Sequence, residues 1–330
     1  MASHTLTSPA IEGASWSADA CPVCRIQSHN VVYPEAWDPI TGDCFRVVEC
    51  SSCGATYTAP RPASMDRYYP RRYRAYGPLV TLILGAFYRM RVSRWAAWKP
   101  KGGSVLEIGC GSGLMLAAFS HRGWKAVGIE RNEEVVARVR PGPGVEITTL
   151  PVEELPAEAR FDLILMFHVL EHIGDPVQSL RECAKRLAPG GRVVVNVPNF
   201  GSWQARFAGT NWLHLDIPRH LVHYTPKTLA ATFERAGLKV SRIGFASIEH
   251  DPYGWVESAS NRITGRSNTL TRFLMGIDRF GPGVALSGVL GVVLALPALL
   301  LACASWLCGC GALMEATAVS AAESSRDRTF

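Results

Sequence analysis

A cluster of glycines follows a short apolar segment at residues 104–108. Gly109, Gly111 and Gly113 stand at alternate positions, with Cys110 between the first two. Glycine lets the backbone approach a ligand closely and adopt positive φ in a tight turn. If the apolar segment is a strand of a parallel sheet, this turn lies at its carboxyl end, where such sheets bind ligands. We therefore expect Gly109, Cys110, Gly111 and Gly113 to contact a cofactor.

Two acidic residues narrow the class of ligand. Glu130, at the end of the next apolar segment, can accept hydrogen bonds from both hydroxyls of a ribose. Glu107 precedes the glycines, where its charge would repel a pyrophosphate but suits a cationic amino acid group. The G-x-G-x-G spacing also differs from the G-x-G-x-x-G of dinucleotide sites. These features favour S-adenosylmethionine, and the alternative is a turn without a ligand and a solvated Glu130.

Residues 100–245 closely resemble the class I S-adenosylmethionine-dependent methyltransferases. Beyond the glycine turn, the resemblance rests on Phe-Asp at 161–162, Val-Leu-Glu-His-Ile-Gly-Asp-Pro at 169–176 and Leu-Ala-Pro-Gly-Gly at 187–191. It implies that the glycine turn and Glu107 contact the cofactor and that Glu130 binds its ribose. Many relatives have an acid for the adenine amine where this chain has Pro151. Val152 can offer only its backbone to the adenine, and Glu153 or Glu154 is the alternative to the missing acid. Phe167 is the remaining expected cofactor contact.

Candidate catalytic residues follow the segment at 161–167. Ubiquinone-type O-methyltransferases, which this stretch resembles, have a glutamate at the position of His168, followed by the same Leu-Glu-His, and can hold a divalent ion there. An imidazole as first ligand does not suit magnesium. The order His-x-x-Glu-His also matches a zinc-peptidase pattern, which we reject because His168 should end a strand. We expect His168 to be a general base or substrate contact, and Glu171 and His172 to serve either chemistry or packing.

A second polar cluster occupies residues 212–224. It resembles the Pro-Arg-His-Leu stretch that borders the active site in many of these methyltransferases, and it is expected to form a lid over the substrate. His220 is the residue of this loop that we expect to be catalytic. The alternative is a structural lid whose histidines bond to the backbone. The cluster contains Trp212, His214, Asp216, Arg219, His220 and His223.

Four cysteines form two close pairs near the N-terminus. Cys21 and Cys24 are separated by two residues, as are Cys50 and Cys53. Four thiolates at this spacing suit a structural zinc ion in tetrahedral geometry, with a short hairpin between the pairs. Free cysteines near the surface are the alternative. Residues 1–20 lack the pattern of a secretory signal, so we expect a cytoplasmic protein with reduced thiols.

The remaining pattern predicts the elements that carry these residues. Strand-length apolar segments alternate with helical patterns from 101 to 245, which indicates a doubly wound, mostly parallel α/β sheet. The resemblance to the methyltransferases implies that this sheet is Rossmann-like and has seven strands, of which the last is antiparallel. The expected strands lie at 104–108, 125–129, 145–149, 161–167, 192–197 and 238–245. The expected helices lie at 113–122, 133–139, 176–187 and 227–236, the third ending at a turn formed by residues 189–191.

A charge-free apolar segment at 281–314 is the main anomaly of composition. In the family that the core resembles, an antiparallel last strand follows a variable insertion, and residues 313–319 fit this strand. The chain must then return to the side that it left. We expect two helices broken near Pro297, each too short to cross a bilayer, that dip into one leaflet. The apolar and arginine-flanked segment at 73–98 suits the same interface. Packing of both segments on each other, or a dimer surface, is the alternative.

These expectations combine into one organisation and one function. The enzyme would methylate a hydroxyl or amine of a small or lipid-linked acceptor at the cytoplasmic face of a membrane. An RNA methyltransferase and a non-catalytic cofactor-binding module are the alternatives, although the net charge of +6 is modest and no nucleic-acid partner is expected. The expected regions are a flexible N-terminus at 1–20, a zinc knuckle at 21–65, a basic and apolar helical linker at 66–99, the catalytic core at 100–250, an apolar helical insertion at 251–311, the last strand at 312–320 and a flexible tail at 321–330.

Overall fold

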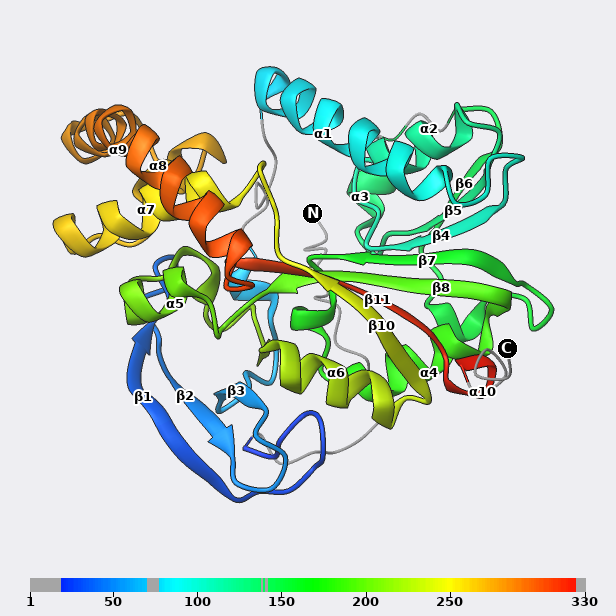
Figure 1. The fold of residues 1–330 in the computed structure, drawn as a ribbon. Coiled ribbons are helices and arrows are strands. Elements are labelled where there is room, and N and C mark those ends of the chain that lie inside the picture. The colour runs from blue at the N-terminus through cyan, green and yellow to red at the C-terminus, as the bar shows by residue number, and fades with distance from the viewer. Residues whose placement is uncertain (1–18, 70–76, 138, 140–141, 325–330) are drawn as a thin grey trace, which may run out of the picture.

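A computed structural model describes residues 19–324, apart from 70–76, 138 and 140–141. Most of the expected flexible termini, residues 1–18 and 325–330, lie outside the described residues. The same holds for three arginines of the linker, Arg71, Arg72 and Arg74. Figure 1 shows a large twisted sheet with a smaller sheet beneath it. The large sheet has seven strands in the order β10-β11-β8-β7-β4-β5-β6. The predicted Rossmann-like fold is therefore confirmed.

The strands of the large sheet agree closely with the sequence pattern. The antiparallel β11 lies between β8 and β10, and the other neighbouring pairs are parallel. Their bounds are β4 Ser104–Ile108, β5 Lys125–Ile129, β6 Val145–Thr148, β7 Phe161–Phe167, β8 Leu187–Pro198, β10 Leu238–Gly244 and β11 Leu313–Ser320.

The turn predicted at residues 189–191 is wrong. These residues belong to β8, and the preceding helix has already ended at Lys185. The register of β8 against β7 shifts between Phe161 and Leu163, which leaves room for the extra residues. Gly190 has φ +70°, and a Cβ on Gly191 would lie 2.8 Å from the carbonyl oxygen of Ala188. The glycines therefore shape an irregularity within a strand.

Helices cover both faces of the large sheet because its residues alternate between two cores. Leu106 and Ile164 lie in a core with residues of α4 and α6, whereas Val105 and Leu163 lie in a core with residues of α1 and α2. In Figure 1, α1 and α2 accordingly lie above the sheet and α4 and α6 below it. The helices are α1 Pro78–Ala96, α2 Leu114–Ser120, α3 Glu133–Val136, α4 Pro176–Lys185, α5 Trp203–Ala208 and α6 Pro226–Arg235.

The N-terminal region shares a sheet with the core. The predicted hairpin between the cysteine pairs is confirmed as β1 His29–Trp37 and β2 Cys44–Cys50, followed by β3 Thr56–Ala59. Strand β3 pairs with β9, Val222–His223, which belongs to the expected lid. Short 3-10 turns complete the framework at η1 Asp66–Tyr68, η2 Val152–Glu154, η3 Leu170–His172, η4 Gly209–Asn211 and η5 Leu213–Leu215.

The break expected near Pro297 is wrong. The insertion consists of α7 Asp251–Thr264, α8 Thr269–Leu274 and one continuous helix, α9 Pro282–Leu307, which leads into β11 and the final α10 Ala321–Ser324. The outward path is α7 and α8, and α9 returns the chain. Ala298 and Ala302 pack against Trp255 and Val256 of α7. This packing offsets the cost of about 3 kcal/mol for proline inside a helix.

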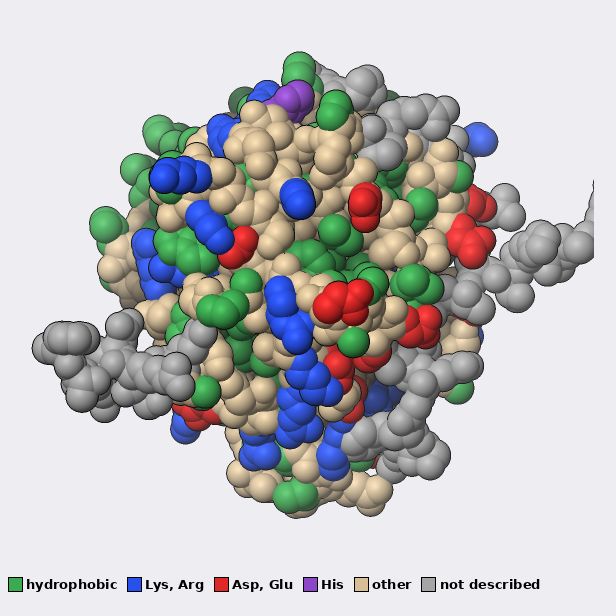
Figure 2. All heavy atoms as spheres, turned by 90° about the vertical axis from the view of Figure 1, so that its right-hand side faces the viewer, with side chains coloured by type: hydrophobic (Ala, Val, Ile, Leu, Met, Phe, Trp, Pro, Cys, Tyr) green, Lys and Arg blue, Asp and Glu red, His purple; other side chains and the backbone are tan. Residues whose placement is uncertain are grey.

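The surface of the large sheet side is mixed in charge, whereas the surface of helix α9 is apolar. Figure 2, which faces the right-hand side of Figure 1, shows Lys and Arg side chains beside Asp and Glu side chains, with hydrophobic side chains scattered among them. Helix α9, in contrast, exposes a row of large apolar side chains, and it alone among the described helices is long and apolar enough to span a membrane. The row comprises Leu286, Val289, Val292, Val293, Leu296, Leu299, Leu300, Leu301 and Leu307.

Candidate active site

The glycine turn occupies the carboxyl end of β4. Gly109, Gly111 and Gly113 have φ of +74°, +51° and +71°, a region that a Cβ makes costly. A Cβ on Gly109 would also lie 2.4 Å from Cγ2 of Val169. The turn therefore lies directly against the segment that follows β7 and carries the candidate catalytic residues.

The two acids lie on either side of this turn. The carboxylate of Glu130 accepts hydrogen bonds from the N–H groups of Gly111, at 3.0 Å, and Asn132, at 2.9 Å. A carboxylate has about four acceptor positions, so it retains capacity for two ribose hydroxyls. Glu107 is buried, and burial with the charge of Glu130 raises the pKa of its carboxyl well above the ordinary value. Its Oε2 has no hydrogen-bond partner among the described residues.

The other expected cofactor residues have different surroundings. The side chain of Val152 lies in the core, so only its backbone can face an adenine. Cys110 is also buried, and burial raises the pKa of its thiol, as expected for a packing residue. Phe167 ends β7, with its ring 5.2 Å from that of Trp95 and the guanidinium of Arg91 5.0 Å from its centre. Helix α1 therefore reaches the expected cofactor pocket.

The strand β7 ends at His168, which adopts φ +52°. Positive φ is uncommon for residues other than glycine and often marks a functional position. The N–H of His168 donates to the carbonyl oxygen of Asn196, and its Nδ1 lies 3.5 Å from Oε1 of Glu171. Glu171 is 1% exposed. An imidazole and a buried carboxylate thus lie next to each other beside the glycine turn.

The lid brings a second imidazole to the same carboxylate. His220 Nδ1 lies 2.8 Å from the carbonyl oxygen of His214, which can only accept, so this nitrogen carries the proton. Its Nε2 lies 4.0 Å from Oε1 of Glu171 and 3.7 Å from Oδ2 of Asp216. In the same way, Nδ1 of His172 donates to the carbonyl oxygen of Arg219 at 2.9 Å. Glu171 therefore lies between His168 and His220.

Glu171, His172 and His220 can also be considered as metal ligands. Their ligand atoms lie within 4.8 Å of one another. His220, from the lid, completes this group, whereas sequence alignment with ubiquinone-type enzymes would have placed the first ligand at His168. Two imidazoles and one carboxylate suit zinc or iron better than magnesium.

Other lid residues have structural roles. His223 is buried with Nε2 3.0 Å from Oγ1 of Thr58, and burial lowers the pKa of its imidazole to about 3, which keeps it neutral. Trp212 is buried and donates its indole N–H to Gln204. The guanidinium of Arg219, 1% exposed, forms ion pairs with Asp216 and with Asp38 of the β1–β2 turn.

The sequence reasoning missed two polar residues near His168. Asn196, at the end of β8, is buried, and its Oδ1 has no hydrogen-bond partner among the described residues. A polar residue within the run of valines was the available signal. The ring of His250 lies 5.0 Å from that of His168. Burial opposes ionisation of the adjacent Glu249, but His250 and Arg91 lower the pKa of its carboxyl to about 2.

The four paired cysteines converge beside the small sheet. Cys21 Sγ lies 3.6 Å from Cys53 Sγ, and Cys24 Sγ lies 3.4 Å from Cys50 Sγ, with all four sulfurs within 4.8 Å of one another. Tetrahedral zinc with Zn–S bonds of about 2.3 Å would separate its sulfurs by roughly 3.8 Å. Both the geometry and the donor set fit zinc. Cys44 is exposed and lies outside this group.

Comparison with known proteins gives the family to which the chain belongs. Residues 82–243 match a family described as a methyltransferase domain. A ubiquinone biosynthesis O-methyltransferase of Bordetella avium is 32% identical over 188 residues, which cover 53% of this chain and 75% of the relative. One from Pseudomonas aeruginosa is 30% identical over 155 residues, covering 43% and 67%. A methyltransferase structure from Archaeoglobus fulgidus covers 71% of this chain and 93% of its own at 19% identity, with a TM-score of 0.45.

The strand order of the large sheet and the glycine turn at the end of β4 are those of a Rossmann-like fold. The chain belongs to the class I S-adenosylmethionine-dependent methyltransferases, and it is an enzyme of that kind.

Proposed function

We propose that this enzyme transfers the methyl group of S-adenosylmethionine to a hydroxyl of a small apolar or lipid-linked acceptor. The observation that carries the proposal is the buried Glu171 carboxylate between His168 and His220, directly beside the glycine turn. A base is needed to remove a hydroxyl proton. The O-methyltransferase names of the relatives also favour oxygen over nitrogen as the acceptor atom.

The residues divide the work as follows. The cofactor supplies a methyl group on a sulfonium, whose C–S bond breaks as the new O–C bond forms. His168, the more exposed of the two imidazoles, takes the hydroxyl proton, and Glu171 stabilises the resulting imidazolium. His220 and the lid hold Glu171 from the other side and exclude water. Asn196 offers its amide oxygen to the acceptor.

Two further parts complete the proposal. The four cysteines bind a zinc ion. The role of this ion is structural, because four protein ligands leave no coordination position open for catalysis. The exposed apolar residues of α9, with Leu82 and Met90 of α1, rest on a membrane surface at the cytoplasmic side, from which a lipid-linked acceptor enters. Arg91 of α1 pairs with Glu249, which directly precedes the insertion, and with Glu315 of β11, which follows it.

The test is transfer of radiolabelled methyl from S-adenosylmethionine into membrane lipid, soluble metabolite and RNA fractions. Label in the lipid or metabolite fraction, released by chemistry specific for methyl ethers, is expected. His168→Gln should lower turnover by about 100- to 10,000-fold with cofactor affinity unchanged. His121→Gln, at an exposed position directly after α2, is the matched control. Label only in RNA, or full activity in His168→Gln, would contradict the proposal.

A further inference from the structure

The β1–β2 turn of the N-terminal region carries one buried carboxylate, that of Asp38, which contacts the lid. Asp38 is 1% exposed, and its Oδ1 lies 2.8 Å from Nη2 of Arg219. Its other oxygen accepts from the N–H and the hydroxyl of Thr41, at 3.0 and 2.7 Å, which closes the turn. A charge that is buried this fully needs its partner, because an unpaired buried ion is strongly unfavourable. The pair therefore fixes Arg219 in one place.

Arg219 passes this constraint to the candidate catalytic residues by two routes. Its Nε donates to Oδ1 of Asp216 at 2.8 Å, and the other oxygen of Asp216 lies 3.7 Å from Nε2 of His220. Its own carbonyl oxygen accepts from Nδ1 of His172. The neighbouring N–H of Leu221 donates to the carbonyl oxygen of Glu171 at 2.7 Å. The position of Arg219 thus sets both sides of the Glu171–His220 contact.

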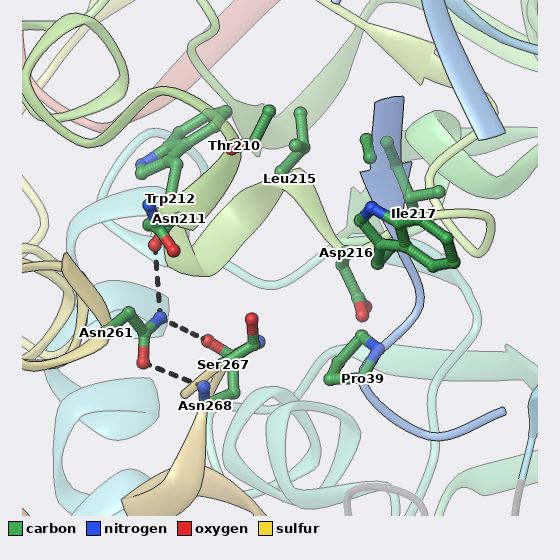
Figure 3. A pocket seen from close by; sticks show the side chains of 12 residues that line it. Pro39, Thr210, Asn211, Trp212, Leu215, Asp216, Ile217, Asn261, Ser267 and Asn268 are labelled. Atoms are coloured by element: carbon green, nitrogen blue, oxygen red, sulfur yellow. Dashed lines mark hydrogen bonds between the residues drawn. The ribbon is translucent and has the colours of Figure 1, made fainter. Parts of the chain in front are cut away.

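The surroundings hold the turn against the lid. Figure 3 shows Pro39, which follows Asp38, beside the carboxylate of Asp216, where the two line a hollow. The carbonyl oxygen of Pro39 also accepts from Nη1 of Arg272 on α8 at 2.8 Å. The lid and helix α8 of the insertion therefore both contact the turn that carries Asp38.

We propose that Asp38 is a positioning residue for methyl transfer, acting through Arg219 on the arrangement of Glu171 and His220. This inference rests on the proposed function. It gives the N-terminal region a role in turnover in addition to any role in folding. Asp38 touches neither acceptor nor cofactor, so its loss changes the rate of the chemical step and leaves cofactor binding unchanged.

Asp38→Asn in the full-length protein tests the proposal, with Thr41→Val as the matched control. The control loses a hydrogen bond to the same carboxylate without touching Arg219. We expect Asp38→Asn to lower kcat by about 100-fold, with the KM for S-adenosylmethionine unchanged and Thr41→Val close to wild type. The double variant Asp38→Asn with Arg219→Gln removes both partners of the Asp38–Arg219 ion pair and should lose no more activity than Arg219→Gln alone.

A second measurement does not depend on activity. In protein with ¹⁵N-labelled histidine, the Nδ1–H of His220 that donates to His214 should give a protected signal in wild type and Thr41→Val, and lose it in Asp38→Asn. An unchanged signal together with unchanged kcat in folded Asp38→Asn would overturn the inference. If the wild type transferred no methyl group but the signal behaved as expected, the positioning role would stand and the proposed function would fail.

Discussion

At the scale of single residues, Glu130 is the acid that ties the glycine turn to the end of β5. Replacing it with alanine should weaken S-adenosylmethionine binding by roughly 10- to 100-fold, because hydrogen bonds to a charged group contribute about 1.5–3 kcal/mol. Isothermal titration calorimetry measures this directly. Glu158→Ala, at an exposed position just before β7, should bind like wild type. Equal affinity in Glu130→Ala would mean that the carboxylate serves only the turn.

The candidate site was predictable only where the sequence carries a local signal. The glycine turn, Glu130 and the histidines around residue 170 stand next to recognisable strands, so their spacing places them at one edge of the sheet. Asp38 gave no such signal, since its partner Arg219 is 181 residues away. His250 approaches His168 only because the chain leaves β10 across the same edge. Contacts of this kind depend on the fold, and no periodicity records them.

At the scale of elements, short apolar strands bounded by polar residues were predictable to the residue. The bounds of β4, β5 and β7 are those expected from the sequence. The continuity of helix α9 through Pro297 was not predictable, because the rule that proline breaks a helix takes no account of what the helix packs against. The small residues on one side of α9 lie on α7 both before and after Pro297, and Ser260 donates to Ser287 at 3.1 Å. Tertiary packing therefore overrides the local preference.

The junction of α7, α9 and β11 is closed by the buried Asp251. Burial raises the pKa of its carboxyl to about 7, although hydrogen bonds from the indole of Trp306 and the N–H of Ala312 oppose the rise. The folded protein then holds a proton that the unfolded chain releases above pH 3.8. The tighter binding of this proton by the folded protein stabilises it. The full stabilisation is present below pH 3.8 and is lost as the pH rises to about 7. It amounts to about 4 kcal/mol at most.

Asp251→Asn should remove this part of the pH dependence. The free energy of unfolding, measured with denaturant at pH 5.5 and 8, should differ less between the two pH values in the variant than in wild type. Asp278→Asn, which changes a surface carboxylate paired with Arg272, should keep the wild-type difference. The same difference in Asp251→Asn and wild type would show that the carboxyl titrates as it does in water.

At the scale of the whole molecule, the small sheet makes the cysteine-rich region part of the enzyme. Strand β3 pairs with β9 of the lid, and Thr58 donates to the carbonyl oxygen of His220 at 2.7 Å. Cys50→Ser should remove the equimolar zinc that we expect in the purified protein and lower the free energy of unfolding by several kcal/mol. Cys44→Ser changes an exposed thiol of the same strand and should keep the bound zinc and the wild-type free energy of unfolding. Metal analysis and denaturant unfolding measure the two effects, and full stability of a zinc-free Cys50→Ser protein would count against a structural ion.

From the apolar row of α9 we predict that the molecule binds to a membrane surface. Four arginines near the start of this helix, Arg262, Arg266, Arg272 and Arg279, favour an anionic bilayer over a neutral one. Wild type should therefore float with vesicles that contain anionic lipid, and Val292→Asp with Leu296→Asp should reduce the bound fraction by at least about tenfold, because two charges would enter the hydrocarbon boundary. Val31→Asp, at an exposed apolar residue of β1, should float like wild type. A wild type that stays off the vesicles and elutes as a dimer, with the doubly substituted protein a monomer, would instead assign the row to a contact between two copies of the chain.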